Sequence, residues 1–291
     1  MKGGEKVRRA PGFIPRTIFF WVFMLFLYGP IAVIAILSFQ GPQGGLTFPM
    51  TGFSLHWFKD VIDPTYIGDF RWPFGRSVIL ALIVMAMTVL VSFLAGLAYR
   101  KGFRGGTVLF YLVITCLVAP SFLVSLGIGL GFANLEMQTQ WWSGGLGAHL
   151  SWTIPIGVLI MLAVFARFDR SLEEAARDLG ATEWQNLRNV VIPIMAPGMI
   201  AVGLFGFTLS YDEFPRTSLV TGTANTLPVE MVAVTGTAAT PSLYAVGTMT
   251  TVFSLAVIII SFVAIYFVQA RRSGRARSIQ ARYGPKSDSA G

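Results

Sequence analysis

Few side chains in this 291-residue chain could form or break covalent bonds. Its two histidines, His56 and His149, are not part of an H-E-x-x-H metal pair, and Cys116 is the only cysteine. No G-x-S-x-G nucleophile motif is present, and no lysine follows a glycine, which excludes a P-loop. The residue types therefore predict a chain that is not an enzyme and holds no metal or nucleotide cofactor.

The one densely charged run is "SLEEAARDLGATEWQNLRNVVIPIMAPG", residues 171–198. Ser171-x-x-Glu174 and Thr182-x-x-Gln185 both read as helix capping boxes. Gly180 lies between them, where the first helix would end with a left-handed residue. Because the residue before Pro193 disfavours helix, the run predicts two short helices followed by a separate apolar helix.

An apolar stripe on the first of these short helices indicates what it could contact. Leu172, Ala175, Ala176 and Leu179 fall at i, i+3, i+4 and i+7. Small alanine side chains allow close approach to another surface, and the flanking charges could pair around its rim. The residues leave two interpretations open: a helix that docks in a partner's groove, or a solvated hairpin that covers its own bundle.

Composition places this run in a membrane protein. The chain is 54% hydrophobic and only 12% charged, against about 25% charged residues in an ordinary soluble domain. Six stretches are long and apolar enough for helices that cross a bilayer. They are Thr17–Phe39, Ser77–Tyr99, Thr107–Ala133, His149–Ala166, Ile194–Tyr211 and Leu243–Val268. The first is too long for a signal-peptide core and lacks a cleavage site, so we expect it to be retained.

The basic residues predict the orientation of these helices. All but four of the 22 lysines and arginines fall on one side of the expected membrane, together with both termini. The four exceptions are Lys59, Arg71, Arg76 and Arg216. The positive-inside rule then places both termini in the cytoplasm of a multi-pass inner-membrane protein in contact with the lipid bilayer. The net charge of +8 is thus an orientation signal, and nucleic acid is not an expected partner.

The remaining segments form loops and tails. "FSLHWFKDVID" in the first external loop predicts a short interfacial helix, and both histidines are interpreted as polar residues in or beside external loops. We expect an N-terminal part at 1–72, a transmembrane core at 73–268 with the two cytoplasmic helices at 169–190, and a basic tail at 269–291.

The spacing within the charged run resembles the signature of importer-type ABC transporter permeases. The matching residues are Glu174-Ala175-Ala176, Gly180 after three more residues, and Val190-x-Ile192-Pro193 after nine more. Val190 and Ile192 stand where the family favours other aliphatic residues. The resemblance implies an all-α type I importer permease fold with six transmembrane helices. It also implies that Glu174, Ala175, Ala176, Leu179, Gly180 and Pro193 belong to a coupling helix seated on a separate ATPase.

A second resemblance is to the spermidine/putrescine branch of these permeases. It rests on "FTLSYDEF" (207–214) and on the following "SLVTGTANTLPVEM" (218–231). It implies that Tyr211, Asp212 and Glu213 line the external part of a path for a small cation, which a carboxylate pair would concentrate. The alternative is structural: Asp212 caps a helix end or pairs with Arg216. Related branches carry thiamine, iron, sulfate or sugar-derived compounds, so the resemblance predicts substrate less sharply than transporter class.

The family resemblance implies a set of partners. This chain would form half of a pore with a second homologous permease, and an ABC ATPase dimer carrying ATP and Mg²⁺ would bind its cytoplasmic side. A periplasmic binding protein would deliver the solute. The alternatives from other classes are a gradient-driven secondary transporter or channel subunit, and a membrane anchor without a transport role. The first usually shows internal repeats and broken helices with mid-membrane ionisable residues, and we find neither in the sequence.

Overall fold

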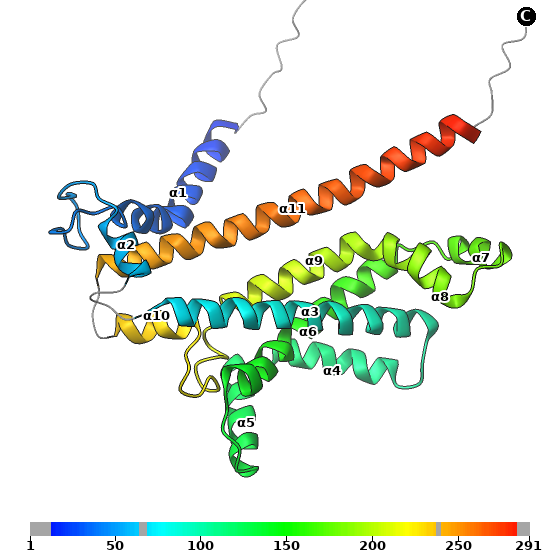
Figure 1. Cartoon of the computed structure of the whole chain (residues 1–291), viewed down its shortest axis with the longest axis horizontal. Coiled ribbons are helices and arrows are strands. Elements are labelled where there is room, and N and C mark those ends of the chain that lie inside the picture. The colour runs from blue at the N-terminus through cyan, green and yellow to red at the C-terminus, as the bar shows by residue number, and fades with distance from the viewer. Residues whose placement is uncertain (1–12, 64–68, 237–239, 284–291) are drawn as a thin grey trace, which may run out of the picture. The chain divides into compact units, whose positions relative to one another are not determined.

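The computed structural model describes residues 13–63, 69–236 and 240–283, and in these residues helices are the only extended elements (Figure 1). Extended pairing within the described residues is limited to one isolated antiparallel bridge, between Gln40 and Phe53. The chain divides into two compact units, residues 1–69 with 234–252 and residues 70–233 with 253–291.

The first unit contains α1 (Phe13–Leu37), α2 (His56–Ile62) and the beginning of α11 (Pro241–Tyr283). Helix α2 confirms the short helix predicted in the first external loop. Before it, the Gln40 side chain donates to the carbonyl of Gly45 and accepts from the amide of Thr51, which closes a compact loop. The buried Asp60 accepts from the hydroxyl of Ser242 at 3.0 Å, which ties α2 to α11.

The second unit carries most of the helices. In chain order these are α3 (Arg71–Lys101), α4 (Gly106–Val118), α5 (Ser121–Asn134), the π-helical turn η1 (Trp141–Gly145), α6 (Leu146–Phe165), α7 (Ser171–Asp178), α8 (Glu183–Asn186), the π-helical turn η2 (Leu187–Val191), α9 (Ile192–Tyr211), α10 (Leu227–Thr235) and the rest of α11. Five helical runs among the described residues are long and apolar enough to cross a membrane, or six if the bent pair α4–α5 counts as one span. This is an all-α membrane fold.

The third expected span, Thr107–Ala133, is not one helix. It is broken into α4 and α5, whose axes differ by 105°. Pro120 stands at the break, and the preceding Ala119 is extended, with φ −60° and ψ 129°. Proline has no amide hydrogen and pushes the residue before it out of the helical region, so the helix cannot continue through this position.

Helices α3, α6 and α9 pack together as the core of this unit (Figure 1). The hydroxyl of Thr88 on α3 donates to Thr153 on α6 at 3.0 Å, and twelve residues later Arg100 lies 5.5 Å from the ring centre of Phe165. Helices α3 and α6 therefore run in the same direction. The chain must return from one end of these helices to the other between them, which favours counting the bent pair α4–α5 as one span, the sixth among the described residues.

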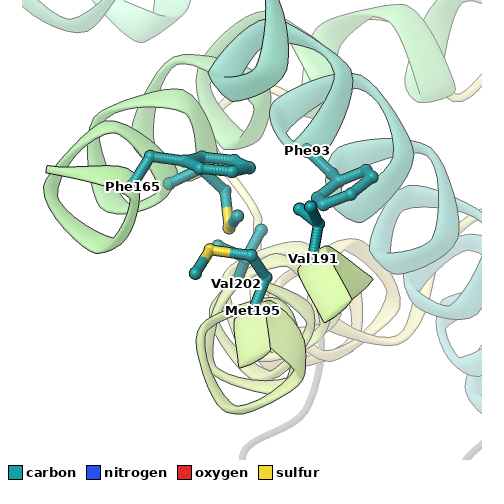
Figure 2. Packing of buried hydrophobic residues seen from close by; sticks show 6 residues of the cluster. Phe93, Phe165, Val191, Met195 and Val202 are labelled. Carbon is teal, nitrogen blue, oxygen red and sulfur yellow. The ribbon is translucent and has the colours of Figure 1, made fainter. Parts of the chain in front are cut away.

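The third core helix, α9, runs opposite to α3 and α6. Its first residues pack with Phe93 and Phe165, while Ser210 near its end bonds to His149 near the start of α6. Figure 2 shows the apolar cluster at the end where α9 begins, with side chains of Phe93, Phe165 and Met195 converging from three helices. The aromatic rings of Phe93 and Phe165 lie 5.9 Å apart between centroids.

Small residues allow these helices to approach closely, as is usual for helices packed in a membrane. A Cβ atom at Gly157 of α6 would lie 2.3 Å from the hydroxyl oxygen of Ser92 and 2.8 Å from Cγ2 of Thr88, both on α3. Gly157 is therefore required by the approach of α3 to α6.

Helix α9 does not begin as a separate span after Pro193, as the sequence had suggested. Instead, α8, η2 and α9 form one helical run, Glu183–Tyr211, in which Pro193 is the second residue of α9. The π-helical turn η2 lies immediately before this proline. A π turn is a local adjustment through which a helix can tolerate a proline, so the run continues.

Candidate functional site

The α7–α8 hairpin, residues 171–186, lies at the end of the core where α3 and α6 finish and α9 begins (Figure 1). Gly180 ends α7 with φ +83°, which confirms the left-handed residue expected from sequence. Its amide donates to the carbonyl of Arg177, and the amide of Ala181 donates to that of Ala176. These two bonds form the Schellman motif that satisfies the last carbonyl groups of a helix.

One of the two predicted capping boxes is confirmed and the other is wrong. At α8 the Thr182 hydroxyl accepts from the amide of Gln185, whose side chain accepts in turn from the amide of Thr182. Ser171, however, is already the first residue of α7. The carboxylate of Asp169 accepts from the Ser171 amide at 3.0 Å instead, and this backbone hydrogen bond is the main reason why the pKa of Asp169 is lowered.

Apolar side chains make up part of the exposed surface of the hairpin. Leu179 is 90% exposed, Trp184 is 64% exposed and Leu172 is 46% exposed. Glu174 and Ala175 are exposed beside them, while Ala176 is half-buried. Apolar residues gathered on an exposed face and rimmed by charge are typical of a surface that binds another protein. Pro193 is half-buried at the start of α9 and does not belong to this face.

The inner side of the hairpin is tied to α3. The guanidinium of Arg100 donates to the carboxylate of Glu173, and both side chains are largely buried, at 15% and 13% exposure. The same guanidinium lies 4.7 Å from the ring centre of Phe168. By contrast, the Arg177–Glu183 pair within the hairpin is open to solvent. Reasoning from sequence missed the role of Arg100, because its partner is 73 positions away.

At the opposite end of the core, the three residues predicted to form a solute path lie in different environments. Tyr211 is 2% exposed, and its ring stacks on Phe207 with a centroid separation of 6.0 Å. Asp212 is exposed, although surrounding protein partly desolvates its carboxyl and raises its pKa above the ordinary aspartate value. Glu213 is buried.

Glu213, and not Asp212, pairs with Arg216. Its carboxylate accepts from the Arg216 amide at 2.9 Å and faces the guanidinium at 3.4 Å. The guanidinium carbon also lies 4.5 Å from the ring centre of Trp152 on α6. The predicted pairing of Asp212 with Arg216 is therefore wrong, whereas its predicted position at a helix end is confirmed: Asp212 is the capping residue at the end of α9, and it is exposed.

His149 is not an interfacial residue, contrary to the expectation from sequence. Helix α6 and its preceding π turn start at Trp141, so His149 lies within the helical run and is 1% exposed. Its two ring nitrogens lie 2.7 Å from the hydroxyls of Ser210 and Thr217. His149 therefore joins α6 to the end of α9 and to the turn that contains Glu213. Its two hydroxyl partners, 61 and 68 residues away, could not be identified from local sequence.

The described residues contain no candidate metal site. No group of three or more His, Cys, Asp or Glu side chains there could hold a metal ion. A cavity of about 770 Å³ lies between α3, α9 and residues 253–261 of α11, but its lining is apolar apart from Ser261. It has no group suited to recognising an ion, and Asp212 does not line it.

Known structures have the same fold. A bacterial ABC transporter that imports the acidic polysaccharide alginate aligns with a TM-score of 0.57, covering 94% of this chain and 99% of that chain at 16% identity. A bacterial alginate ABC transporter in complex with a periplasmic protein bound to an alginate pentasaccharide aligns with a TM-score of 0.56, covering 94% of this chain and 93% of that chain at 14% identity. These similarities define the chain as having the fold of an ABC importer permease.

Comparison of sequences gives the family. Residues 88–275 match the family described as the binding-protein-dependent transport system inner membrane component, and the chain belongs to this family. The spermidine/putrescine permease PotC of Haemophilus influenzae is 28% identical over 251 residues, 86% of this chain and 95% of PotC. The putrescine permease PotI of Escherichia coli K12 is 29% identical over 263 residues, 88% of this chain and 91% of PotI.

Proposed function

We propose that this permease forms half of the pore of an ATP-driven importer and moves a polyamine, or a similar small organic cation, into the cytoplasm. The observation that carries the proposal is the exposed apolar face of the α7–α8 hairpin, placed where three core helices meet. The hairpin lies within the part of the chain that matches the family. A solvated hairpin that only covered its own bundle would bury Leu179, which is 90% exposed.

The hairpin is the proposed docking element for a partner ATPase. Glu174, Ala175, Leu179 and Gly180 lie on or beside its exposed face, and Ala176 packs beneath it. Movement of a docked ATPase would act directly on α9, because α8, η2 and α9 form one helical run. Pro193 stands in this run, where it follows the π turn. The ATPase dimer would bind ATP and Mg²⁺, and this chain would hold no cofactor.

The remaining partners complete the importer. A second homologous permease would supply the other half of the pore, and a periplasmic binding protein would deliver the solute at the end opposite the hairpin. This places the hairpin and both termini in the cytoplasm, in agreement with the distribution of basic residues. One structural neighbour is an alginate transporter in complex with a periplasmic protein, which supports such a partner here.

The proposed cationic substrate rests on two kinds of support. The relatives PotC and PotI are named as permeases for spermidine and putrescine. In this chain Asp212 presents a carboxylate at the outer end of α9, whereas the carboxylate of Glu213 is occupied by Arg216. We therefore propose that Asp212 attracts the cation. Glu213 stabilises the turn that contains Arg216, and Tyr211 stabilises the buried end of α9.

Replacement of Asp212 tests this assignment. Two unit charges about 4 Å apart interact by about 4 kcal/mol at an effective dielectric of 20, and solvent reduces this. We expect Asp212→Asn to lower spermidine or putrescine uptake roughly tenfold at limiting substrate, with no change in the amount of folded permease. Uptake would be measured in cells without their own polyamine importers that express the chain with candidate partner subunits.

Glu213→Gln provides the matched comparison. It leaves Arg216 buried without its carboxylate partner, so we expect less folded protein, partly restored by also introducing Arg216→Gln. Desolvation raises the pKa of Asp212, so its carboxylate becomes protonated at a higher pH than that of an ordinary aspartate. As the pH is lowered, uptake by the parental protein should therefore begin to fall at this higher pH. The Asp212→Asn variant should lack this component. Parental uptake rates in a stable Asp212→Asn variant would refute the assignment.

A further inference from the structure

We propose that Arg100 is a positioning residue that makes α3 move together with the α7–α8 hairpin. The inference rests on the proposed docking of an ATPase to the hairpin. It adds a second connection through which movement of the hairpin reaches the core helices. The first route is covalent, from α8 through η2 into α9. The second is the ion pair between Arg100 and Glu173, which joins the hairpin to the last turn of α3.

Arg100 contacts three neighbouring parts of the fold. Its guanidinium donates to the Glu173 carboxylate on α7, and it lies 5.5 Å from the ring centre of Phe165 and 4.7 Å from that of Phe168. Its backbone carbonyl accepts from the guanidinium of Arg170 at 2.7 Å. Phe165 belongs to the apolar core cluster shown in Figure 2. A displacement of α7 is therefore passed to α3 and to the aromatic residues at the end of α6.

Side-chain packing does not fill the space around the Arg100–Glu173 ion pair. A cavity of about 400 Å³ lies between the end of α3 and the hairpin, lined among others by Leu97, Lys101, Trp184 and Asn186. Close-packed interiors transmit displacement, whereas a void lacks partner atoms on one side. The specific polar contacts of Arg100 therefore carry much of the connection between the hairpin and α3.

The neighbouring glutamates Glu173 and Glu174 face different partners. Glu174 is exposed on the side of the proposed ATPase, whereas Glu173 is largely buried against Arg100. An ion pair that is largely removed from water holds its partners more firmly than an exposed pair. Arginine is also suited to this position because its planar guanidinium can bond a carboxylate and lie over an aromatic ring at once.

The test compares Arg100→Gln, Glu173→Gln and the double variant in the complete transporter. The matched control is Lys101→Gln, which removes one positive charge from the exposed neighbouring position. In purified complexes one would measure the amount of ATPase retained, basal ATP hydrolysis, hydrolysis stimulated by spermidine-loaded binding protein, and spermidine uptake in vesicles. Arg100→Lys keeps the charge but loses the planar contact, and it serves as a milder variant if Arg100→Gln does not fold.

We expect both single variants to retain the ATPase and its basal activity but to lose stimulation and uptake by about tenfold, within the usual range of coupling between sites. The double variant should be no worse than either single one, because each already lacks the tie. Arg100→Lys should show an intermediate loss and Lys101→Gln none.

Two results would overturn the inference. Normal stimulation of ATP hydrolysis and normal spermidine uptake in the single variants would show that α3 moves with the hairpin without the Arg100–Glu173 ion pair. Loss of the ATPase from the variant complexes would show that the pair shapes the docking surface rather than relays movement. The proposed function fails separately, if the parental chain neither retains an ATPase nor shows stimulated hydrolysis.

Discussion

Gly180 is the residue on which the shape of the hairpin depends most directly. Its φ of +83° lies in the left-handed region, and the turn that it makes brings α8 back beside α7. A Cβ atom at this position would meet no other atom within 4 Å, so space does not restrict the residue type. The backbone conformation alone favours glycine here.

Substitutions at Gly180 can therefore distinguish the effect of backbone conformation from the effect of side-chain size. Valine in the left-handed region should cost about 1–2 kcal/mol and disturb the hairpin, whereas asparagine tolerates this region far better. We expect Gly180→Val to reach the membrane but retain less ATPase and transport less solute, while Gly180→Asn stays close to the parental protein. Both properties can be followed by copurification and uptake. Equal behaviour of the two variants would contradict the role of the turn.

At the scale of elements, the core is held by close approach and a few buried polar bonds. Thr88 and Thr153 join α3 to α6 beside Gly157, and His149 joins α6 to the end of α9 through Ser210. Lipid provides no hydrophobic force between helices, so tight packing of small residues must supply the association. The same arrangement fixes the direction of α3 relative to α6, and hence the crossing of α4–α5.

Gly157→Ala tests this packing. The added methyl group would lie 2.3 Å from the Ser92 hydroxyl oxygen and 2.8 Å from Cγ2 of Thr88, so these side chains or the two helices must shift. Overpacking of this kind typically costs about 1–3 kcal/mol, which should lower the midpoint of thermal unfolding in detergent. Gly147→Ala on the same helix is the control, because nothing lies within 4 Å of its Cβ position. Ser92→Ala should restore part of the stability of Gly157→Ala.

At the scale of the whole molecule, the decisive feature is the number of crossings. The 105° break at Pro120 could suggest that the third segment enters the membrane and leaves on the same side. The parallel course of α3 and α6 requires the chain to change sides between them. With α4–α5 counted as one span, the expected topology has six crossings and both termini on the same side, as the basic residues also predict.

Reporter fusions can test this topology. A reporter that is active only in the periplasm should give signal when fused after Gly44 or Gly222 and none after Gly105 or Gly180. The fusions at Gly105 and Gly180 flank α4, α5 and α6, so their agreement tests whether the bent pair crosses once. Opposite signals from these two fusions would refute six crossings.

The sequence by itself determined the features that depend on neighbouring residues. Apolar runs of about twenty residues indicate helices that cross the membrane, and most of the predicted spans overlap helices of the structure. Gly180 and the Thr182–Gln185 capping box were predictable because each involves residues within one or two helical turns. The family signature around Glu174 is equally local, and the roles assigned to its residues stay predictions.

Tertiary structure decided which distant side chains meet. Nothing near Arg100 in the sequence indicates Glu173, and nothing near His149 indicates Ser210 and Thr217. Tertiary structure also separated Asp212 from Glu213, because the fold buries Glu213 against Arg216 and leaves Asp212 exposed. The physical reason is common to all three: burial and pairing of a charge or a hydrogen-bonding group depend on which helices lie side by side, and local periodicity carries no record of that arrangement.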